Sequence, residues 1–235
     1  MTALRQCAVR SAAEADGRLS VAGRSAELYY PAVMAHVLAR LNGFGMTLIP
    51  NWPYSFEREG EGSNVVHATR WTPSGPAKVT IEPGSPVDGN DVVDVGGGFD
   101  VPYWLIETSI FSVQWPAGFT VNSPQDAGDG TPFYLQGQGE AAIFMQGPVL
   151  RSRLSDPDAL VAPGQSVLSR RSDDNGVASI ELTYLHDDEQ WWQAHWMMPC
   201  QADHFVVITA QSLLAASATT RTAAETAVAT FESSA

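Results

Sequence analysis

The sequence has few cysteines, a single lysine and no long apolar run, and each shortage excludes a class of protein. Only Cys7 and Cys200 occur in the 235 residues, which excludes a disulfide framework and a cysteine-rich zinc site. No apolar run approaches the ~18 residues of a membrane-spanning helix. Lys78 stands alone against twelve arginines, a bias more typical of a GC-rich bacterial genome than of a particular function.

The first residues also lack the apolar segment of a secretory signal. MTALRQCAVRSAAEADGR contains basic residues but no apolar core, so it does not fit a signal peptide. We therefore expect a soluble, cytoplasmic protein, and the sequence leaves a specialised export route for folded proteins open.

Positive charge is scarce outside the N-terminal part of the chain. The net charge is −13. Residues 1–45 carry five arginines against three acids, and the remainder carries eight basic residues against 23 acids. An acidic surface repels phosphate backbones. The composition therefore argues against a nucleic-acid partner and favours another protein.

Common nucleotide and hydrolase motifs are absent. The sequence has no G-x-S-x-G elbow, no H-E-x-x-H pair and no P-loop. Gly96-Gly97-Gly98 follows the strand-like DVVDV, but FDVPYWLIE comes next. A phosphate loop needs a helix at that point, so we predict an ordinary loop or bulge and expect no cofactor.

Periodicity divides the chain into three parts. Residues 1–45 form an N-terminal extension with one amphipathic helix over 31–41. Residues 46–108 form a short β-rich segment, in which strand-like runs alternate with Gly, Pro, Asn and Asp. Residues 109–235 form the main antiparallel domain.

A helix is predicted over residues 222–233, at the end of the third part. Thr222 and Glu225 match a capping box. The apolar face of this helix is expected to contain Ala224, Ala227, Val228 and Phe231.

The stretch HDDEQWWQAHWMMPCQADH contains His186, His195 and His204, spaced nine apart. Alternation predicts a three-stranded antiparallel meander over 177–210 whose buried face holds Trp192, Ala194, Trp196, Met198 and Cys200. The two outer histidines then lie at turns at opposite ends of the sheet, roughly 25–30 Å apart. Zinc ligands lie within ~2.3 Å of the metal, so we predict no metal site.

A reduced catalytic hypothesis remains for His195. On the neighbouring strand, Glu181 or Thr183 is expected directly across from it, depending on register. A His195–Glu181 pair is suited to acid–base chemistry, whereas the alternative is a structural pair of polar side chains. The sequence alone does not decide between the catalytic pair and the structural pair.

Aromatic residues supply the candidate binding surface. We expect the β-rich segment to have more aromatic residues than it can easily bury, and exposed aromatics often anchor protein interfaces. The alternative is a second small core. The candidates are Trp52, Tyr54, Trp71, Tyr103, Trp104 and Trp191.

The run FSVQWPAGFTV resembles the strand, Pro-Xaa-Gly turn and aromatic strand that open PsbP-like domains. That group includes the photosystem extrinsic subunit, Mog-type factors and bacterial proteins of the DcrB and LpqN type. The resemblance covers residues 109–235, and the apolar strand FVVITAQ followed by the C-terminal helix is also similar. It implies an α+β fold, namely an α/β/α-type sandwich with a central antiparallel sheet and a C-terminal helix packed on it. A mostly-β sandwich is the alternative.

Three functions follow from these observations. The first is a non-catalytic binding, adaptor or assembly module for a protein partner, which is also the role that the resemblance implies. The second is a hydrolase-like enzyme using His195 and Glu181. The third is a carrier of a small apolar ligand, with the Trp and Met face lining a cavity. The sequence predicts no oligomeric state.

Overall fold

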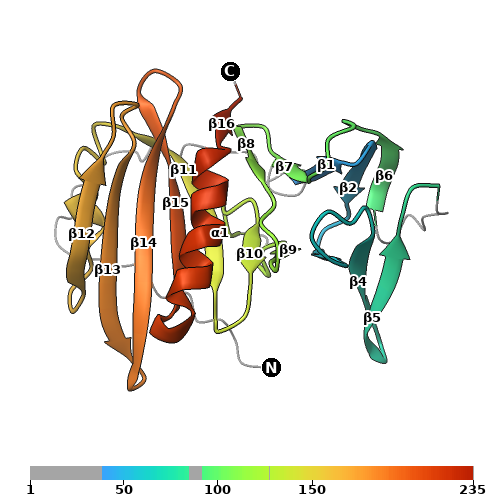
Figure 1. Ribbon diagram of the computed structural model, residues 1–235, viewed down its shortest axis with the longest axis horizontal. Coiled ribbons are helices and arrows are strands. Elements are labelled where there is room, and N and C mark those ends of the chain that lie inside the picture. The colour runs from blue at the N-terminus through green and yellow to red at the C-terminus, as the bar shows by residue number, and fades with distance from the viewer. Residues whose placement is uncertain (1–38, 85–91, 127, 235) are drawn as a thin grey trace, which may run out of the picture.

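The computed structural model describes residues 39–84, 92–126 and 128–234 as a mostly-β protein with a single α-helix (Figure 1). Its first strands are β1 Arg40–Gly43, β2 Met46–Pro50, β3 Ser55–Arg58, β4 Val66–Thr72, β5 Gly75–Ile81, β6 Val92–Gly97, β7 Leu105–Glu107 and β8 Phe111–Gln114. The later strands are β9 Thr120–Asn122, β10 Tyr134–Gln136, β11 Ala142–Leu150, β12 Ser166–Ser172, β13 Ala178–His186, β14 Glu189–Cys200, β15 His204–Leu213 and β16 Glu232–Ser233. The helices are η3 Pro157–Leu160 and η4 Leu214–Ala216, both 3-10, and α1 Ser217–Ala229.

The strands form two antiparallel sheets. A ten-stranded sheet has the order β12-β13-β14-β15-β11-β10-β9-β3-β4-β5, and a six-stranded sheet has the order β16-β8-β7-β1-β2-β6. The larger sheet runs from β12 at one end of the molecule to β5 at the other (Figure 1). The pairing of β3 with β9 joins the strands of the C-terminal part of the chain to those of the β-rich segment within this sheet.

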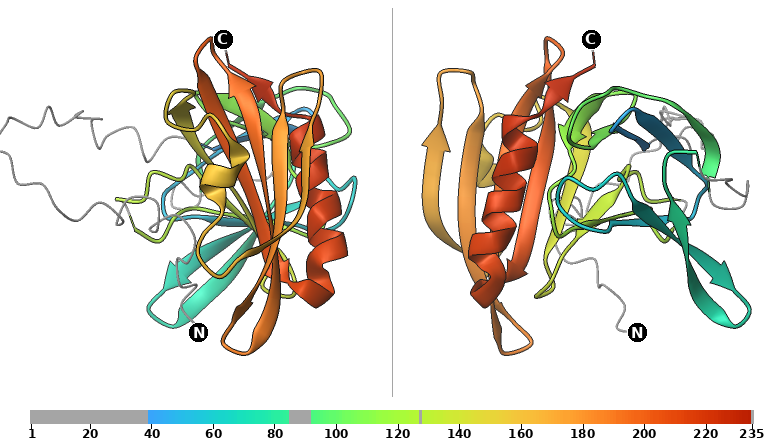
Figure 2. Two further views of the ribbon diagram at one scale, coloured as in Figure 1. Left: turned by 90° about the vertical axis from the view of Figure 1, so that its left-hand side faces the viewer. Right: turned by 45° about the vertical axis from the view of Figure 1, so that its right-hand side comes forward.

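The predicted α/β/α-type sandwich is wrong, and the mostly-β alternative is closer. Helix α1 is the only α-helix in the part of the chain that the structure describes, and it packs on one face of the β14–β15–β11 region (Figure 2). The opposite face is covered by an apolar cluster of Leu154, Met197, Phe205 and Val207, together with Leu160 from η3. A loop segment with one short 3-10 helix therefore replaces the second helical layer.

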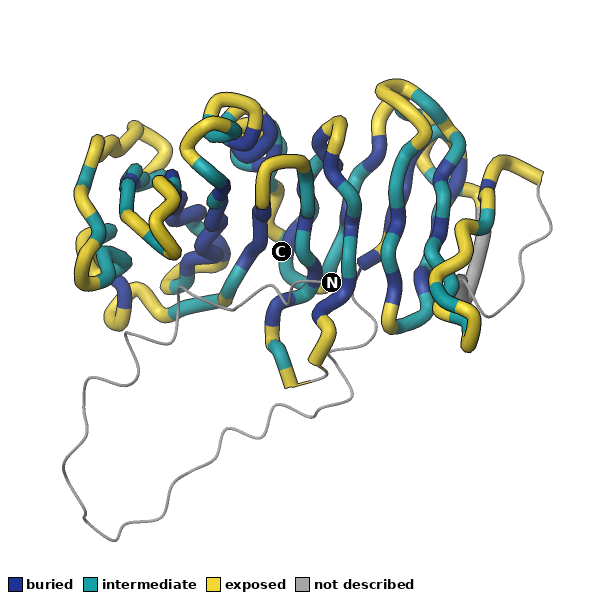
Figure 3. The backbone as a smooth tube through the Cα atoms, turned by 90° about the horizontal axis from the view of Figure 1, so that it is seen from below, coloured by how far each residue is buried: buried dark blue, intermediate teal, exposed yellow. Residues whose placement is uncertain are grey.

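The predicted segment boundaries at 45/46 and 108/109 fall between paired strands. β1 pairs with β2 across the first, and β7 pairs with β8 across the second. One large apolar core, containing Leu41, Phe56, Val113, Ile143 and Trp192, joins all three parts. Buried and less buried residues alternate along many of the strands around this core (Figure 3).

The helix predicted over 31–41 is wrong where it can be compared with the structure. Residues 31–38 lie outside the described residues, but Arg40 and Leu41 belong to strand β1. Leu41 is fully buried between Leu48 and Ile106 on the neighbouring strands. Pairing with two strands thus outweighs the local helical spacing at this point.

The helix predicted over 222–233 exists, but it lies earlier in the chain. α1 begins at Ser217, so Thr222 is internal and donates to the Ala218 carbonyl at 3.1 Å instead of capping the helix. Ala224 and Ala227 are buried as predicted. Phe231 follows the helix and stacks on Phe111, with 5.6 Å between ring centroids.

The three-stranded meander is confirmed. β13, β14 and β15 pair antiparallel in sequence, and Trp192, Trp196 and Met198 are buried on one face. Phe111, Val113 and Trp115 are buried in the same alternating way along β8 and the residue that follows it.

Candidate functional site

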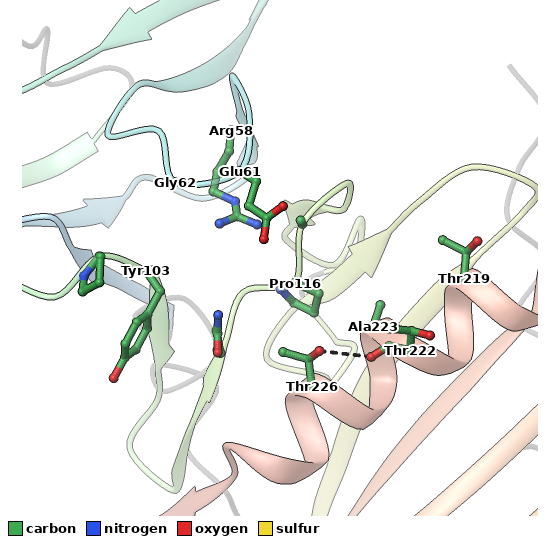
Figure 4. A pocket seen from close by; sticks show the side chains of 12 residues that line it. Arg58, Glu61, Gly62, Tyr103, Pro116, Thr219, Thr222, Ala223 and Thr226 are labelled. Carbon is green, nitrogen blue, oxygen red and sulfur yellow. Dashed lines mark hydrogen bonds between the residues drawn. The ribbon is translucent and has the colours of Figure 1, made fainter.

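A groove of about 650 Å³ lies where the two sheets and α1 come together (Figure 4). It is lined by residues from four separate stretches of the chain, which supply one basic side chain, one carboxylate and several neutral groups. The lining residues are Arg58, Glu61, Gly62, Pro102, Tyr103, Gln114, Pro116, Ala117, Thr219, Thr222, Ala223 and Thr226. We call this cavity the groove below.

Arg58 ends strand β3 and is the only cation among the described residues that line the groove. Its guanidinium carbon lies 5.2 Å from the centre of the Trp115 ring. Trp115 is fully buried, and its indole nitrogen donates to the Phe119 carbonyl at 2.6 Å. Burial lowers the pKa of Arg58, and the nearby Glu61 partly opposes that effect. A fixed aromatic ring thus holds a partly desolvated cation at the groove.

Tyr103 contributes an aromatic side chain that is 37% exposed. The backbone beneath it is held tightly, because a Cβ on Gly43 would overlap the Tyr103 carbonyl oxygen. The next residue, Trp104, is fully buried, and its indole nitrogen donates to the Ser63 carbonyl at 3.2 Å. This bond ties the turn that carries Glu61 to the loop that carries Tyr103.

Helix α1 supplies the remaining wall, with the side chains of Thr222 and Thr226 near Pro116 (Figure 4). The Thr226 hydroxyl donates to the Thr222 carbonyl at 3.0 Å, so its oxygen keeps lone pairs that can accept a further bond. The backbone N–H of Gln114 donates to the Thr230 hydroxyl at 3.0 Å, joining β8 to the end of the helix. The walls of the groove are thus linked by hydrogen bonds as well as by packing.

The proposed His195–Glu181 pair does not form. Ile180 stands across from His195, and Glu181 stands across from Ala194. Because side chains on adjacent residues of a strand point to opposite faces, the two groups lie on opposite faces of the sheet. The alternative partner, Thr183, is also on the other face, across from Trp192.

His195 is a buried, structural residue. Only 3% of it is exposed, and its Nδ1 lies 2.9 Å from the Thr209 hydroxyl. Its Nε2 is buried without a hydrogen-bond partner among the described residues. Burial lowers the pKa of His195 to about 4, so the ring is neutral at pH 7.

Glu181 takes part in a different contact, beneath α1. Its carboxylate accepts from the Arg221 guanidinium at 2.6 Å and from the Trp192 indole nitrogen at 3.4 Å. The Arg221 guanidinium also lies 5.3 Å from the Trp192 ring centre. These contacts anchor the helix to the sheet and give Glu181 a structural role.

The six candidate aromatic residues differ in how far they are exposed. Tyr54 and Trp104 are core residues, so the prediction that they anchor a surface interface is wrong. Trp71 is 53% exposed near the tip of the β4–β5 hairpin. Trp52 and Trp191 are half-buried, and Trp191 stacks on Tyr184. Tyr103 alone of the six lines the groove.

The three evenly spaced histidines are held apart as their spacing predicts. His186 pairs with Glu189 at one end of the β14 ladder, His195 lies in its middle, and His204 pairs with Cys200 at the other end. Within residues 39–84, 92–126 and 128–234, no three His, Cys, Asp or Glu side chains come together as a metal site would require. Cys200 is buried, and burial raises its pKa.

The expected carrier cavity is filled by protein. Trp192, Trp196 and Met198 belong to the main core, where Ala223, Ala224 and Ala227 of α1 are also buried. Among the described residues, no helix is both long enough and apolar enough to span a bilayer.

Most of the groove residues gave no signal in the sequence. Arg58 lies in the acid-rich run SFEREGEG, and the threonines of α1 lie in a segment that was predicted to be helical from its apolar residues. These stretches are separated by up to about 170 positions in the chain, so only the long-range strand pairings bring them together.

Comparison with known proteins gives little further guidance. No protein-family model matches the sequence, and no curated protein is significantly similar to it. One solved structure with a similar chain path is that of LpqN, described as involved in cell envelope biogenesis of Mycobacterium tuberculosis. The likeness has 14% identity and a TM-score of 0.30, and it covers 50% of this chain and 71% of LpqN. This is a distant likeness, in line with the LpqN-type resemblance in the sequence, and it carries no functional argument.

Proposed function

We propose that this protein is a non-catalytic binding module that holds a segment of a partner protein in the groove. The observation that carries the proposal is the convergence of Arg58, Tyr103 and the threonine face of α1 on one cavity of about 650 Å³. Binding sites typically have volumes of roughly 300–1,000 Å³ and combine apolar walls with a few placed polar groups.

The chemistry of the lining supports binding over catalysis. Among the described residues, those that line the groove include one carboxylate, Glu61, and no histidine, cysteine or lysine. General acid–base catalysis needs a proton donor and acceptor that converge on one substrate. The two residues first considered for that role, His195 and Glu181, are on opposite faces of the sheet and line no part of the groove.

The residue types in the groove suit a protein partner. Tyrosine and arginine are enriched at the centres of protein interfaces, where each can supply a large contact area and directed hydrogen bonds. Pro116 and Ala117 add apolar surface to the groove, and the helix adds hydroxyl acceptors. Arg58 and Gln114 lie on paired strands and the threonines on the docked helix α1, while the turns that carry Glu61 and Tyr103 are tied together by the Trp104–Ser63 hydrogen bond. A shape that is largely set before binding lowers the entropy cost of association.

The test fills the groove without touching the core. Thr222 is exposed on the groove side of α1, so Thr222→Trp places a large ring in the cavity. Glu225→Trp makes the same kind of change at an exposed position of the same helix outside the groove. We expect affinity capture from the native cell, read by mass spectrometry, to recover a protein with the wild type and Glu225→Trp but not with Thr222→Trp. Equal recovery by both variants would overturn the proposal.

A further inference from the structure

Arg58 is half-buried at the groove and makes no ion pair with the described residues. Arg170 and Arg221 contact Asp158 and Glu181 at 2.6 Å, and Lys78 contacts Glu57. In the described part of the chain no acidic oxygen lies within 4 Å of the Arg58 guanidinium. Its contact is the face of Trp115, which leaves the edge of the guanidinium free for other groups.

Glu61 is close to Arg58 without neutralising it. The two side chains lie near each other at one side of the groove (Figure 4). The carboxylate is near enough to act on the pKa of Arg58, yet the pair does not reach ion-pair distance. No nitrogen of Arg58 is among the buried unpartnered atoms, so its guanidinium remains open to solvent. A bound anion can replace that water with charge-assisted hydrogen bonds.

We infer that the groove recognises a single carboxylate group on the bound protein segment through Arg58. This inference rests on the function proposed above and names the chemistry of its partner. A planar guanidinium donates two parallel hydrogen bonds to a carboxylate, which fixes both the position and the orientation of the ligand.

The surroundings restrict the ligand to one negative charge. The groove contains no second cation, and Glu61 repels additional anions. The chain beyond residue 45 carries 23 acids against eight basic residues, so an acidic run or a phosphate of charge −1.5 to −2 would be opposed. The other lining groups, Tyr103, Pro116 and the α1 threonines, suit apolar or neutral neighbours of the carboxylate.

The inference can be tested on the full chain with a minimal probe pair. N-acetyl-L-phenylalaninate carries one carboxylate beside an apolar ring, and N-acetyl-L-phenylalaninamide is its neutral counterpart. Titrated over the millimolar range and followed by amide NMR shifts, the carboxylate should produce saturable changes at Gly62, Tyr103, Gln114 and Ala117. The amide should bind about 10-fold or more weakly, as expected for the loss of a charge-assisted hydrogen bond.

Three variants assign the effect to Arg58. Arg58→Gln should weaken carboxylate binding by about 10-fold or more, whereas Glu61→Gln should strengthen it by removing a repelling charge. Arg151→Gln is the matched control, because Arg151 also lies over an aromatic ring, 4.4 Å from the centre of Phe205, but lines no part of the groove. Its affinity for the probe should equal that of the wild type.

The inference is overturned if the carboxylate causes no saturable shifts in the groove of the wild type. It is also overturned if the carboxylate and the amide bind equally, or if Arg151→Gln weakens binding as much as Arg58→Gln. The wild-type probe comparison holds even if Arg58→Gln fails to fold. Should Thr222→Trp abolish partner capture while Arg58→Gln leaves it unchanged, the groove binds a partner but the carboxylate does not direct it.

Discussion

The buried ring of His195 makes the stability of this protein depend on pH in a defined window. The ordinary pKa of a histidine is 6.5, and in the folded protein burial lowers that of His195 to about 4. As the pH falls, the unfolded chain therefore takes up the proton before the folded one does. The contribution of His195 to stability is complete above pH 6.5 and declines as the pH falls towards 4.

The size of this effect follows from the shift. One pKa unit corresponds to about 1.4 kcal/mol, so between pH 7 and pH 4.5 the free energy of unfolding should fall by about 2–3 kcal/mol through this one residue. The ring cannot escape the cost by a small movement, since it is held by Thr209 and faces the buried Ile180 across the strands.

His195→Gln removes the titrating group while keeping a polar side chain beside Thr209. Urea unfolding of both proteins at several pH values isolates the effect, because carboxylates that titrate in the same window are common to both and cancel in the difference. We expect the wild type to lose about 2–3 kcal/mol relative to His195→Gln between pH 7 and pH 4.5. Parallel stability curves would refute the assignment of His195 as a buried neutral ring.

Two further predictions concern the core. Trp196 is 9% exposed and belongs to the main apolar cluster, so Trp196→Ala should lower the free energy of unfolding by about 3–5 kcal/mol; a well-folded variant that loses less than about 1 kcal/mol would contradict the assigned buried face. Phe231 stacks on Phe111 beyond the end of α1, and an isolated helix of this length is marginal in water. Phe231→Asp should therefore reduce the hydrogen-exchange protection of residues 217–229 more than that of β13 to β15, and unchanged protection of the helix would contradict the docking.

The sequence predicted side-chain alternation well and register poorly. Apolar residues at every second position from Trp192 to Cys200 set the face that packs in the main core, since a slip by one residue would move all of them to the other face of the sheet. The register between β13 and β14 depends instead on their connection at Asp187 and Asp188, which both have positive φ, at 49° and 63°. Such a two-residue hairpin turn is usually signalled by Asn-Gly or Asp-Gly, so Asp-Asp left the partner of His195 open.

Local patterns also misplaced both helical boundaries. Leu41 matches a helical spacing, but it belongs to strand β1, where it pairs with residues of β2 and β7. Thr222 and Glu225 match a capping box, but α1 continues from the 3-10 turn η4 and begins at Ser217 without a side-chain cap.

The position of the groove could not be predicted from local sequence patterns. Its walls meet only because β3 pairs with β9 and β7 pairs with β8, and nothing near Arg58 signals those pairings.

The most direct test of the binding function is site-specific photo-crosslinking in the native cell. A benzophenone amino acid placed at Thr222 or Tyr103 faces the groove, whereas one at Glu225 or at the exposed Leu168 of β12 lies outside it. We predict that the two groove positions yield adducts with the same protein and that the two outer positions do not. Adducts with that protein from Glu225 or Leu168, with none from Thr222 and Tyr103, would contradict the assignment of the groove as the binding site.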